Sequence, residues 1–538
     1  MSDGPWDVVV AGAGHNSLVT ACYLAKAGYR CLVVEARERP GGGCVTEELL
    51  LPGYAVDTCA TGHTLIRTNP LLADDELGLL ADYGLSYVDP EPVAHVAFPD
   101  GEHLTMSLDV EATADEIGRF SADDAEAYRR LLDEYDEVKH LFSRSQHVPV
   151  GFGPSLDQLL AEHPRGRLWQ RRRMLSAWDV VRTEFESRHV RSFMLWMAFQ
   201  TNQPLDVPGT GMLAYRIMFG RQQRSWSIPV GGSQKLVDGL VGFLEGHGGE
   251  VRCGQAVSRL LVEDRRCVGV ETEKGEQFRA TQAVVSTVHV TQLVSMAPAE
   301  LWPEELHYAV ATYDVGIPGF GVYCLADVAP EFETPFGPRS SVLAGTVGWP
   351  EDLLRLGFDL RHGRFVTDVA WLLVATPTLA DPGRAPAGHH TVKVLSHQAY
   401  EPPGGLGAWP SVKEEHARRQ LDHLRRFAPN FTDNHILAQT VRSPADIEAD
   451  NRHMVHGAYH GGDRGVAQSG PGRPAPGWAS HRMPIPGLYQ TGATTHPGGS
   501  ITGIPGRNAA RVVLTDLRRD PDEVLCGSGA GAPKVMAR

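Results

Sequence analysis

Hydrophobic residues near the start of the chain follow two different spacings in turn. Residues 8–11 and 31–34 are short apolar runs rich in valine, which is typical of buried strands. Between them, apolar side chains recur with the spacing of one helix face: Leu18, Ala21, Cys22, Leu24 and Ala25. The order predicts strand, helix and strand, which is the βαβ unit of a parallel sheet.

Helical spacing dominates the next part of the chain. Residues 111–142 have a helical pattern, within which Ser121 is expected to be an N-cap, followed by acidic residues in the first turn. Residues 156–198 predict a second helical region. After a helix at 236–246, four short apolar runs predict strands: 250–252, 260–262, 268–270 and 282–286. A helix is expected at 413–427, and the chain closes with a short strand, a glycine-rich loop and an apolar helix ending near Leu517.

Composition and charge narrow the class of protein. A chain of 538 residues exceeds one compact core, so at least two lobes are expected. The net charge of −15 argues against nucleic acid as a partner. The eight cysteines form no Cys-x-x-Cys pair, and the histidines show no ligand spacing, so no metal site is predicted.

The expected location follows from what the sequence lacks. No apolar run reaches the ~18 residues of a membrane helix, and the N-terminus does not read as a signal peptide. We therefore expect a cytoplasmic protein. The run Arg171–Arg173 is expected to be solvated, with peripheral contact to an anionic membrane surface as the alternative.

The first candidate site lies in the turn of the βαβ unit. Gly12 permits a tight turn, and Gly14 lets the backbone approach a pyrophosphate at the positive end of the following helix. Glu35 ends the second strand, where an acid can accept a hydrogen bond from a ribose hydroxyl. Ser17 stands where a third glycine or alanine is usual. This region alone predicts a dinucleotide, either NAD or FAD.

Two further glycine-rich segments favour FAD. Residues 41–43 are three glycines just after the acid, where backbone crosses close to a ligand. Residues 492–503 form a glycine-rich loop before the last apolar helix, which offers a second positive helix end. A long cofactor explains both ends of the chain, with pyrophosphate at the first helix and the flavin ring at the second.

The string Gly-Ala-Thr-Thr-His-Pro-Gly-Gly-Ser-Ile-Thr-Gly-Ile-Pro-Gly-Arg-Asn at 492–508 closely resembles the phytoene-desaturase-like family of FAD oxidoreductases, as do residues 443–448 and 473–478. The family includes phytoene-dehydrogenase-related oxidoreductases (pyridine nucleotide-disulfide oxidoreductase domain 2 type) and flavin-type β-carotene ketolases. The motifs and the resemblance together predict these FAD contacts: Gly12, Gly14, His15, Asn16, Ser17, Glu35, Arg37, Gly42, Gly43, Val257, Gly492, Gly498, Gly499, Ser500, Ile501 and Gly503.

The resemblance implies an α/β fold: a Rossmann-like FAD-binding domain of the amine-oxidase and phytoene-desaturase type, with an inserted mixed substrate domain. We expect residues 1–110, 228–295 and 455–520 to form the discontinuous FAD-binding domain. Residues 111–227 and 296–454 are then the helical, substrate-binding domain, and residues 521–538, rich in small residues, are expected to be a disordered tail.

The predicted function is dehydrogenation of a largely apolar small molecule, with hydride passing to flavin N5 and then to dioxygen or a quinone. Three residues are candidates for catalysis: His63, His496 and Arg507. The small, polar segment 465–472 departs from the bulky apolar residues of the family, which argues against a carotenoid substrate. Two alternatives stay open: a flavin-dependent isomerase or reductase of a polyene or natural-product intermediate, and a non-catalytic escort of the GDP-dissociation-inhibitor type. Neither the oligomeric state nor the substrate follows from the sequence.

Overall fold

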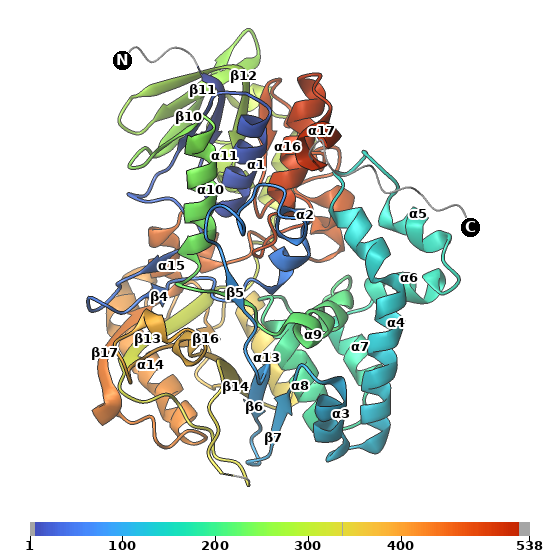
Figure 1. Cartoon of the computed structure of the whole chain (residues 1–538), viewed down its shortest axis with the longest axis vertical. Coiled ribbons are helices and arrows are strands. Elements are labelled where there is room, and N and C mark those ends of the chain that lie inside the picture. Colours follow the sequence, from blue (N-terminus) through green and yellow to red (C-terminus); the bar gives the residue numbers. More distant parts are fainter. Residues whose placement is uncertain (1–5, 336, 527–538) are drawn as a thin grey trace.

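The computed structural model describes residues 6–335 and 337–526, in which two large sheets form the centres of two lobes (Figure 1). The first sheet lies in the upper lobe of that view, and the second lies in the lower lobe beside a group of helices. Segments from both ends of the chain meet in the upper lobe, where α1 (His15–Lys26) packs against α16 (Ile504–Asp516).

The first sheet has a parallel half and an antiparallel half. Its parallel strands follow the order β9 (Glu250–Arg252), β2 (Cys31–Val34), β1 (Trp6–Ala11), β12 (Gln277–Ser286) and β18 (Leu488–Gln490). β10 (Val257–Glu263) and β11 (Arg266–Thr272) extend the first part of β12 as an antiparallel meander. The βαβ unit expected from the sequence is thus present, with β1 and β2 paired in parallel.

Helices cover both faces of this sheet, and β1 is accordingly apolar on both sides. Val8 and Val10 join a core with residues of α1, α16 and α10 (Gln234–Gly246), whereas Val9 and Ala11 join a core on the other face. The second core includes α11 (Val290–Leu293) and α12 (Glu304–Ala311). Strands buried on both faces have no polar alternation, which is why residues 8–11 form a continuous apolar run.

The second sheet is mostly antiparallel and joins segments that are far apart in sequence. Its strands follow the order β17 (Ile436–Arg442), β13 (Gly319–Ala326), β16 (His390–His397), β15 (Trp371–Ala375), β14 (Leu343–Val347), β6 (Ala94–Ala97) and β7 (His103–Met106). Two two-stranded sheets complete the set: β3 (Thr46–Glu47) with β4 (Val56–Asp57), and β5 (Tyr87–Val88) with β8 (Ile228–Pro229). In the chain, α13 (Pro350–Arg361) lies between β14 and β15, α14 (Trp409–Arg425) lies between β16 and β17, and α15 (Pro444–Asp450) follows β17.

A group of helices flanks the second sheet, on the right of Figure 1. It comprises α3 (Val110–Gly118), α4 (Ala122–Gln146), α5 (Leu156–Ala161), α6 (Gly166–Met174), α7 (Ala177–Glu184), α8 (Arg188–Phe199) and α9 (Met212–Arg224). Ser121 caps α4 and accepts a hydrogen bond from Asp124 N–H, as the sequence predicted. The arginine run differs from its prediction: Arg172 is buried between Glu134 and Glu184, and of the three only Arg171 is exposed.

Strand pairing shifts the expected boundaries of the lobes. Residues 1–110 are predicted to belong to the FAD-binding domain, but β6 and β7 pair through β14 with the second sheet. Residues 521–526, expected to be disordered, form helix α17 (Pro521–Cys526), which packs against α16 and buries Leu525. Leu525 and the partly buried Val524 pack against the core, and Asp522 forms an ion pair with Arg511, so these contacts hold the helix in place. The rest of the expected tail, 527–538, lies outside the described residues.

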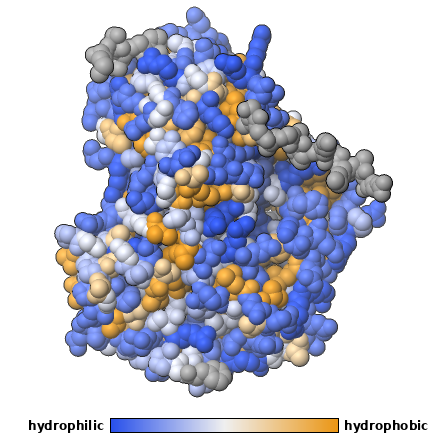
Figure 2. Space-filling view, viewed as in Figure 1, coloured by the Kyte–Doolittle hydropathy of each residue, from blue (hydrophilic) through white to orange (hydrophobic). Residues whose placement is uncertain are grey.

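The helices and one face of the surface were compared with what contact with a membrane requires. Within residues 6–335 and 337–526, every helix is too short or too polar to cross a bilayer. Figure 2 shows a face on which hydrophilic residues dominate and hydrophobic residues form several separate groups.

Candidate functional site

A cavity of about 760 Å³ lies between the two lobes. Its walls include the carboxyl ends of β1 and β2, the loops at 42–43 and 492–501, and the face of β15 and β16. Ligands of open α/β sheets bind outside the carboxyl ends of the parallel strands, so the position of the cavity is the one expected for a dinucleotide.

The two glycine-rich loops of the N-terminal region pack directly on each other. Gly12 has φ +96°, and Gly41 N–H donates to Ala13 O at 2.9 Å. A Cβ atom at Gly42 would lie 2.9 Å from Gly14 Cα, so Gly42 has no room for a side chain at that contact. A Cβ at Gly14 would meet no atom within 4 Å, because this glycine faces the open cavity. The bare backbone at Gly14 leaves the space that a pyrophosphate needs.

Glu35 is fixed by the backbone of the same loops. Its Oε2 accepts Ala13 N–H at 2.6 Å and its Oε1 accepts Arg37 N–H at 3.0 Å. Burial raises the pKa of the Glu35 carboxyl above its ordinary value, and the backbone N–H groups partly offset this rise. Arg37 forms an ion pair with Asp450 at 3.0 Å, and all three side chains line the cavity. Each Glu35 oxygen has a second lone pair that can accept a ribose hydroxyl.

Ser17 has a defined role in the first loop. Its hydroxyl lies 2.6 Å from Gly12 O and 2.9 Å from Gly14 O, and the side chain is fully buried. The hydroxyl can donate to either carbonyl and so holds the turn before α1. A glycine or alanine could not make this hydrogen bond, so the departure from the usual motif contributes to the rigidity of the loop.

The C-terminal loop divides into lining and supporting residues. Gly492, Ser500 and Ile501 line the cavity. Three glycines lie behind them, with these nearest neighbours of an added Cβ: Arg473 for Gly498, His460 O for Gly499, and Asn69 for Gly503. Gly503, with φ +65°, is the residue from which α16 begins. These three glycines therefore shape the loop without facing the cavity.

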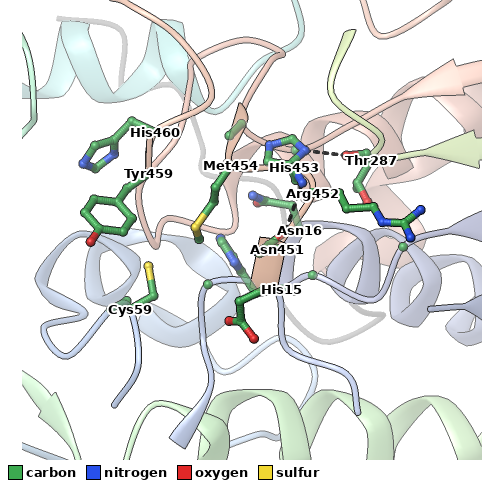
Figure 3. Close-up of a pocket in the computed structure, with 18 of the residues that line it drawn as sticks. His15, Asn16, Cys59, Thr287, Asn451, Arg452, His453, Met454, Tyr459 and His460 are labelled. Carbon is green, nitrogen blue, oxygen red and sulfur yellow. Dashed lines mark hydrogen bonds between the residues drawn. The ribbon is translucent and has the colours of Figure 1, made fainter. Parts of the chain in front are cut away.

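Two polar atoms beside Gly14 have no partner within the protein. His15 Nε2 and Asn16 Oδ1 are buried and unpaired, and both residues line the cavity (Figure 3). Burial lowers the pKa of His15 to about 4, so its imidazole is neutral at pH 7. Buried polar atoms are normally paired, and these two are placed to bind a ligand with polar groups. Val257, the first residue of β10, also lines the cavity. The residues present fit FAD.

The three candidates for catalysis do not line this cavity. His63 is fully buried and lies 3.0 Å from Ser233 Oγ and 3.3 Å from Tyr87 Oη. His496 Nε2 lies 3.2 Å from Ser145 O. Arg507 forms a two-point ion pair with Glu76, at 2.6 and 2.9 Å. Each makes the contacts of a residue that supports the fold, and a catalytic role for any of them stays a prediction.

The second sheet supplies lining residues that the sequence alone did not reveal. Trp371 and Leu373 alternate on β15, and Lys393, Leu395 and His397 alternate on β16, so that one face of the sheet points into the cavity. The period-two pattern of residues 390–397 was the available signal. None of residues 465–472, whose polarity argued against a carotenoid, lines the cavity.

Three polar side chains on this side, those of Lys393, His397 and His460, are neutral or already paired. Lys393 Nζ donates to Cys59 O at 2.6 Å and to Thr61 Oγ1 at 2.7 Å. Burial lowers the pKa of this amine to about 8. Burial also lowers the pKa of His397 and His460 to about 3. Tyr459, His460 and Cys59 lie together at one end of the region drawn in Figure 3.

Comparison with known proteins agrees with this geometry. A family model described as flavin-containing amine oxidoreductase matches residues 18–514. This chain belongs to that family. The oxidoreductase binds FAD as its cofactor, and its Rossmann-like fold is the one predicted from the two glycine-rich ends.

Several relatives align with nearly the whole oxidoreductase. It is 29% identical to a subunit of the limonene dehydrogenase of Castellaniella defragrans, covering 98% of both chains. It is 27% identical to mouse pyridine nucleotide-disulfide oxidoreductase domain-containing protein 2, covering 95% of this chain and 94% of the relative. A lycopene-forming phytoene desaturase of Pantoea ananas is 25% identical, over 94% of this chain and 99% of the relative. These alignments confirm the resemblance inferred from the motifs.

Among solved structures, putrescine oxidase bound to putrescine superposes with a TM-score of 0.59 at 15% identity, covering 96% of this chain and 100% of the other. At that identity the likeness concerns the fold alone. The family match disfavours the escort-protein alternative, because it groups the chain with flavin enzymes.

Buried neutral histidines make the stability of the oxidoreductase sensitive to acid. Burial lowers the pKa of His63 to about 3, whereas an unfolded histidine titrates near its ordinary value of 6.5. Between these values the unfolded chain binds a proton that the folded chain does not. The free energy of unfolding therefore falls as the pH drops from 6.5 towards 3, by up to about 1.4 kcal/mol per pH unit for each such histidine.

We expect His63→Gln to weaken this pH dependence by one proton while lowering stability at neutral pH. Urea unfolding of both proteins at about pH 7 and about pH 5 measures the difference. An equal loss of stability on acidification in the two proteins would show that His63 is protonated in the folded state.

Proposed function

We propose that this oxidoreductase dehydrogenates a largely apolar organic molecule. The observation that carries the proposal is the face of the second sheet that borders the cavity, where Trp371, Leu373 and Leu395 line it together with Trp226. Limonene dehydrogenase and phytoene desaturase, both named for apolar substrates, are relatives over nearly the full chain. Both points favour an apolar substrate over a polar one.

The protein's own contribution in this proposal is to bind, orient and exclude water. Bound FAD supplies a two-electron acceptor, which dioxygen or a quinone then reoxidises. Dehydrogenation of an apolar molecule depends on positioning in a dry pocket more than on a strong acid or base. The neutral His397 and His460, and Lys393 with its amine held by Cys59 O and Thr61, suit a site without a dedicated proton carrier.

Anaerobic reduction of the bound flavin tests the proposal. The holoenzyme is mixed with limonene, phytoene or putrescine, and the loss of oxidised-flavin absorbance is followed. We expect reduction by at least one of the two hydrocarbons and none by putrescine. Reduction by putrescine alone, or by no donor, would overturn the proposal.

Two leucine variants show whether the sheet face contributes. Leu373→Gln places an amide on the cavity wall, whereas Leu379→Gln changes a leucine that is 38% exposed. We expect Leu373→Gln to slow reduction by about tenfold or more, since an amide that loses water without a partner costs ~1–3 kcal/mol. Leu379→Gln is the control and should reduce at the wild-type rate.

The domain division and the membrane contact also stay proposals. We propose that residues 1–110, 228–295 and 455–520 contribute the FAD-binding lobe, less the strands β6 and β7. For a membrane surface, the arginine run offers little, because Arg172 pairs with Glu134 and Glu184 and Arg173 pairs with Asp157.

A further inference from the structure

A second, smaller cavity of about 80 Å³ adjoins the first. Six residues line both cavities: Gly62, Gln200, Arg221, His460, Ser500 and Ile501. Gln200, Arg221 and His460 come from segments outside the nucleotide-binding sheet. Gln200 and Arg221 belong to the segment 111–227 that we assign to the substrate, so a molecule in the main cavity can reach the smaller one along that side.

Three arginines line the smaller cavity, and we call them the arginine pocket: Arg216 and Arg221 of α9, and Arg464. Their hydrogen bonds go to neutral groups. Arg221 donates to Thr64 Oγ1 at 2.6 Å and to Gln200 Oε1 at 3.1 Å. Arg216 donates to Gln146 Oε1 at 3.0 Å, and Arg464 donates to Gly499 O.

None of these three guanidinium groups forms an ion pair with a described residue, although acidic residues outnumber basic ones by 65 to 50 in the chain. Arg464 Nε is buried without a partner of any kind. Asp463, next in sequence, uses its carboxylate to accept Gly465 N–H instead. The positive charge of the pocket is therefore left for something outside the protein to balance.

Two other buried arginines have carboxylate partners, whereas the buried Arg473 donates to backbone carbonyls, including Asp463 O and Ala493 O. Arg172 lies between Glu134 and Glu184, and Arg384 lies between Asp57 and Asp381. Burying a charge without a counterion is costly, because the lost hydration is not replaced. Burial lowers the pKa of Arg221 and of Arg464 to about 9, which still leaves both charged at pH 7. The arginine pocket is thus a cationic site that an anion would stabilise.

We propose that the arginine pocket binds the carboxylate of the substrate, whose apolar body lies in the main cavity. This inference rests on the proposed function and adds apolar carboxylic acids to the substrates that it covers. The guanidinium fork matches the two oxygens of a carboxylate. A cavity of about 80 Å³ suits one such group. Because Arg221 lines both cavities, it would mark the junction between acid and hydrocarbon.

Binding to the oxidised holoenzyme tests this without turnover. Geranic, cinnamic and oleic acids are each titrated beside their methyl esters, and binding is followed by the change in the flavin absorption spectrum. We expect at least one acid to bind about tenfold to a hundredfold more tightly than its ester, the range for a charge-assisted hydrogen bond. Equal binding within every pair would overturn the inference.

Variants then locate the preference. Arg464→Gln and Arg221→Gln should each remove most of the preference for the acid, and Arg464→Lys should retain part of it. Arg171→Gln, which removes one charge from an exposed position, is the control and should retain all of it. If either glutamine variant does not fold, the other still decides. A full preference in Arg464→Gln, or its loss in Arg171→Gln, would contradict the assignment.

Two further measurements distinguish a substrate carboxylate from other partners of the arginine pocket. Acetate and inorganic phosphate are titrated in the same way, and binding as tight as that of the acids would make this a site for free anions, overturning the inference. A changed flavin potential in Arg464→Gln with the acid preference intact would place the charge on the flavin instead, with the same consequence. Failure of all donors to reduce the flavin would sink the proposed function alone, since the acid and ester comparison needs no reduction.

Discussion

The Gly12→Ala variant is expected to lose at least about tenfold in its affinity for FAD. Gly12 has φ +96°, a conformation that costs a residue with a side chain ~1–3 kcal/mol. The added Cβ would also lie 2.3 Å from Thr287 Oγ1. That oxygen is held by its hydrogen bond to Ala11 O at 3.0 Å, so the loop must move instead. Flavin content after purification, and titration of the apoprotein with FAD, measure the effect.

A matched glycine separates backbone strain from the clash. Gly28 has φ +92°, but an added Cβ there would meet no atom within 4 Å, and the residue is exposed. Gly28→Ala carries the same strain and should keep its flavin. If Gly12→Ala also bound FAD with wild-type affinity, the first loop would not be the cradle that we describe.

Replacing Arg384 with leucine is expected to lower the free energy of unfolding by about 3–5 kcal/mol, the usual cost of removing one partner from a buried ion pair. Arg384 is completely buried and contacts Asp57 at 2.5 Å, Asp381 at 2.8 Å and Pro229 O at 2.7 Å. Burial opposes ionisation of Asp57, yet Arg384 and Lys393 hold the pKa of its carboxyl below the ordinary value. Without Arg384, two carboxylates lose their cation in a dry environment.

Urea unfolding measures the loss, and flavin affinity shows whether the effect reaches the cavity. Asp57 closely precedes the segment 59–62 that lines it, so Arg384→Leu should also weaken FAD binding. Arg172→Leu removes an arginine buried between Glu134 and Glu184 in the helical group. That variant should lose stability and keep its flavin affinity. A change below about 1 kcal/mol in Arg384→Leu would show that water replaces the missing cation.

Local chemistry made the cofactor end of this site readable from the sequence. Gly12, Gly14 and Glu35 lie within one βαβ unit, where spacing along the chain fixes spacing in the fold. The loop at 492–501 carried the same signal of glycines before an apolar helix. Such features depend on residues that are close together in sequence, so they can be recognised without knowledge of the tertiary structure.

The rest of the site depends on contacts that the chain order hides. His397 and Trp371 face the cavity only because β15 and β16 pair in one register of the second sheet. Arg172 seemed solvated because its partners, Glu134 and Glu184, belong to other helices. His496 stands in the most distinctive string of the sequence, yet its ring meets Ser145 O outside the cavity lining. Motif membership thus located the loop correctly without locating its side chains.

Strand β18 and the loop after it also bear on how the enzyme is made. β18 pairs with β12, and Gly492, Ser500 and Ile501 complete the cavity wall, so residues near 490–501 close a site begun by residues 8–14. During synthesis, the ribosome delivers these final pieces after some nine-tenths of the chain, and domains fold as units once their segments have emerged. We therefore expect nascent chains to acquire FAD only near release, which makes truncated products flavin-free.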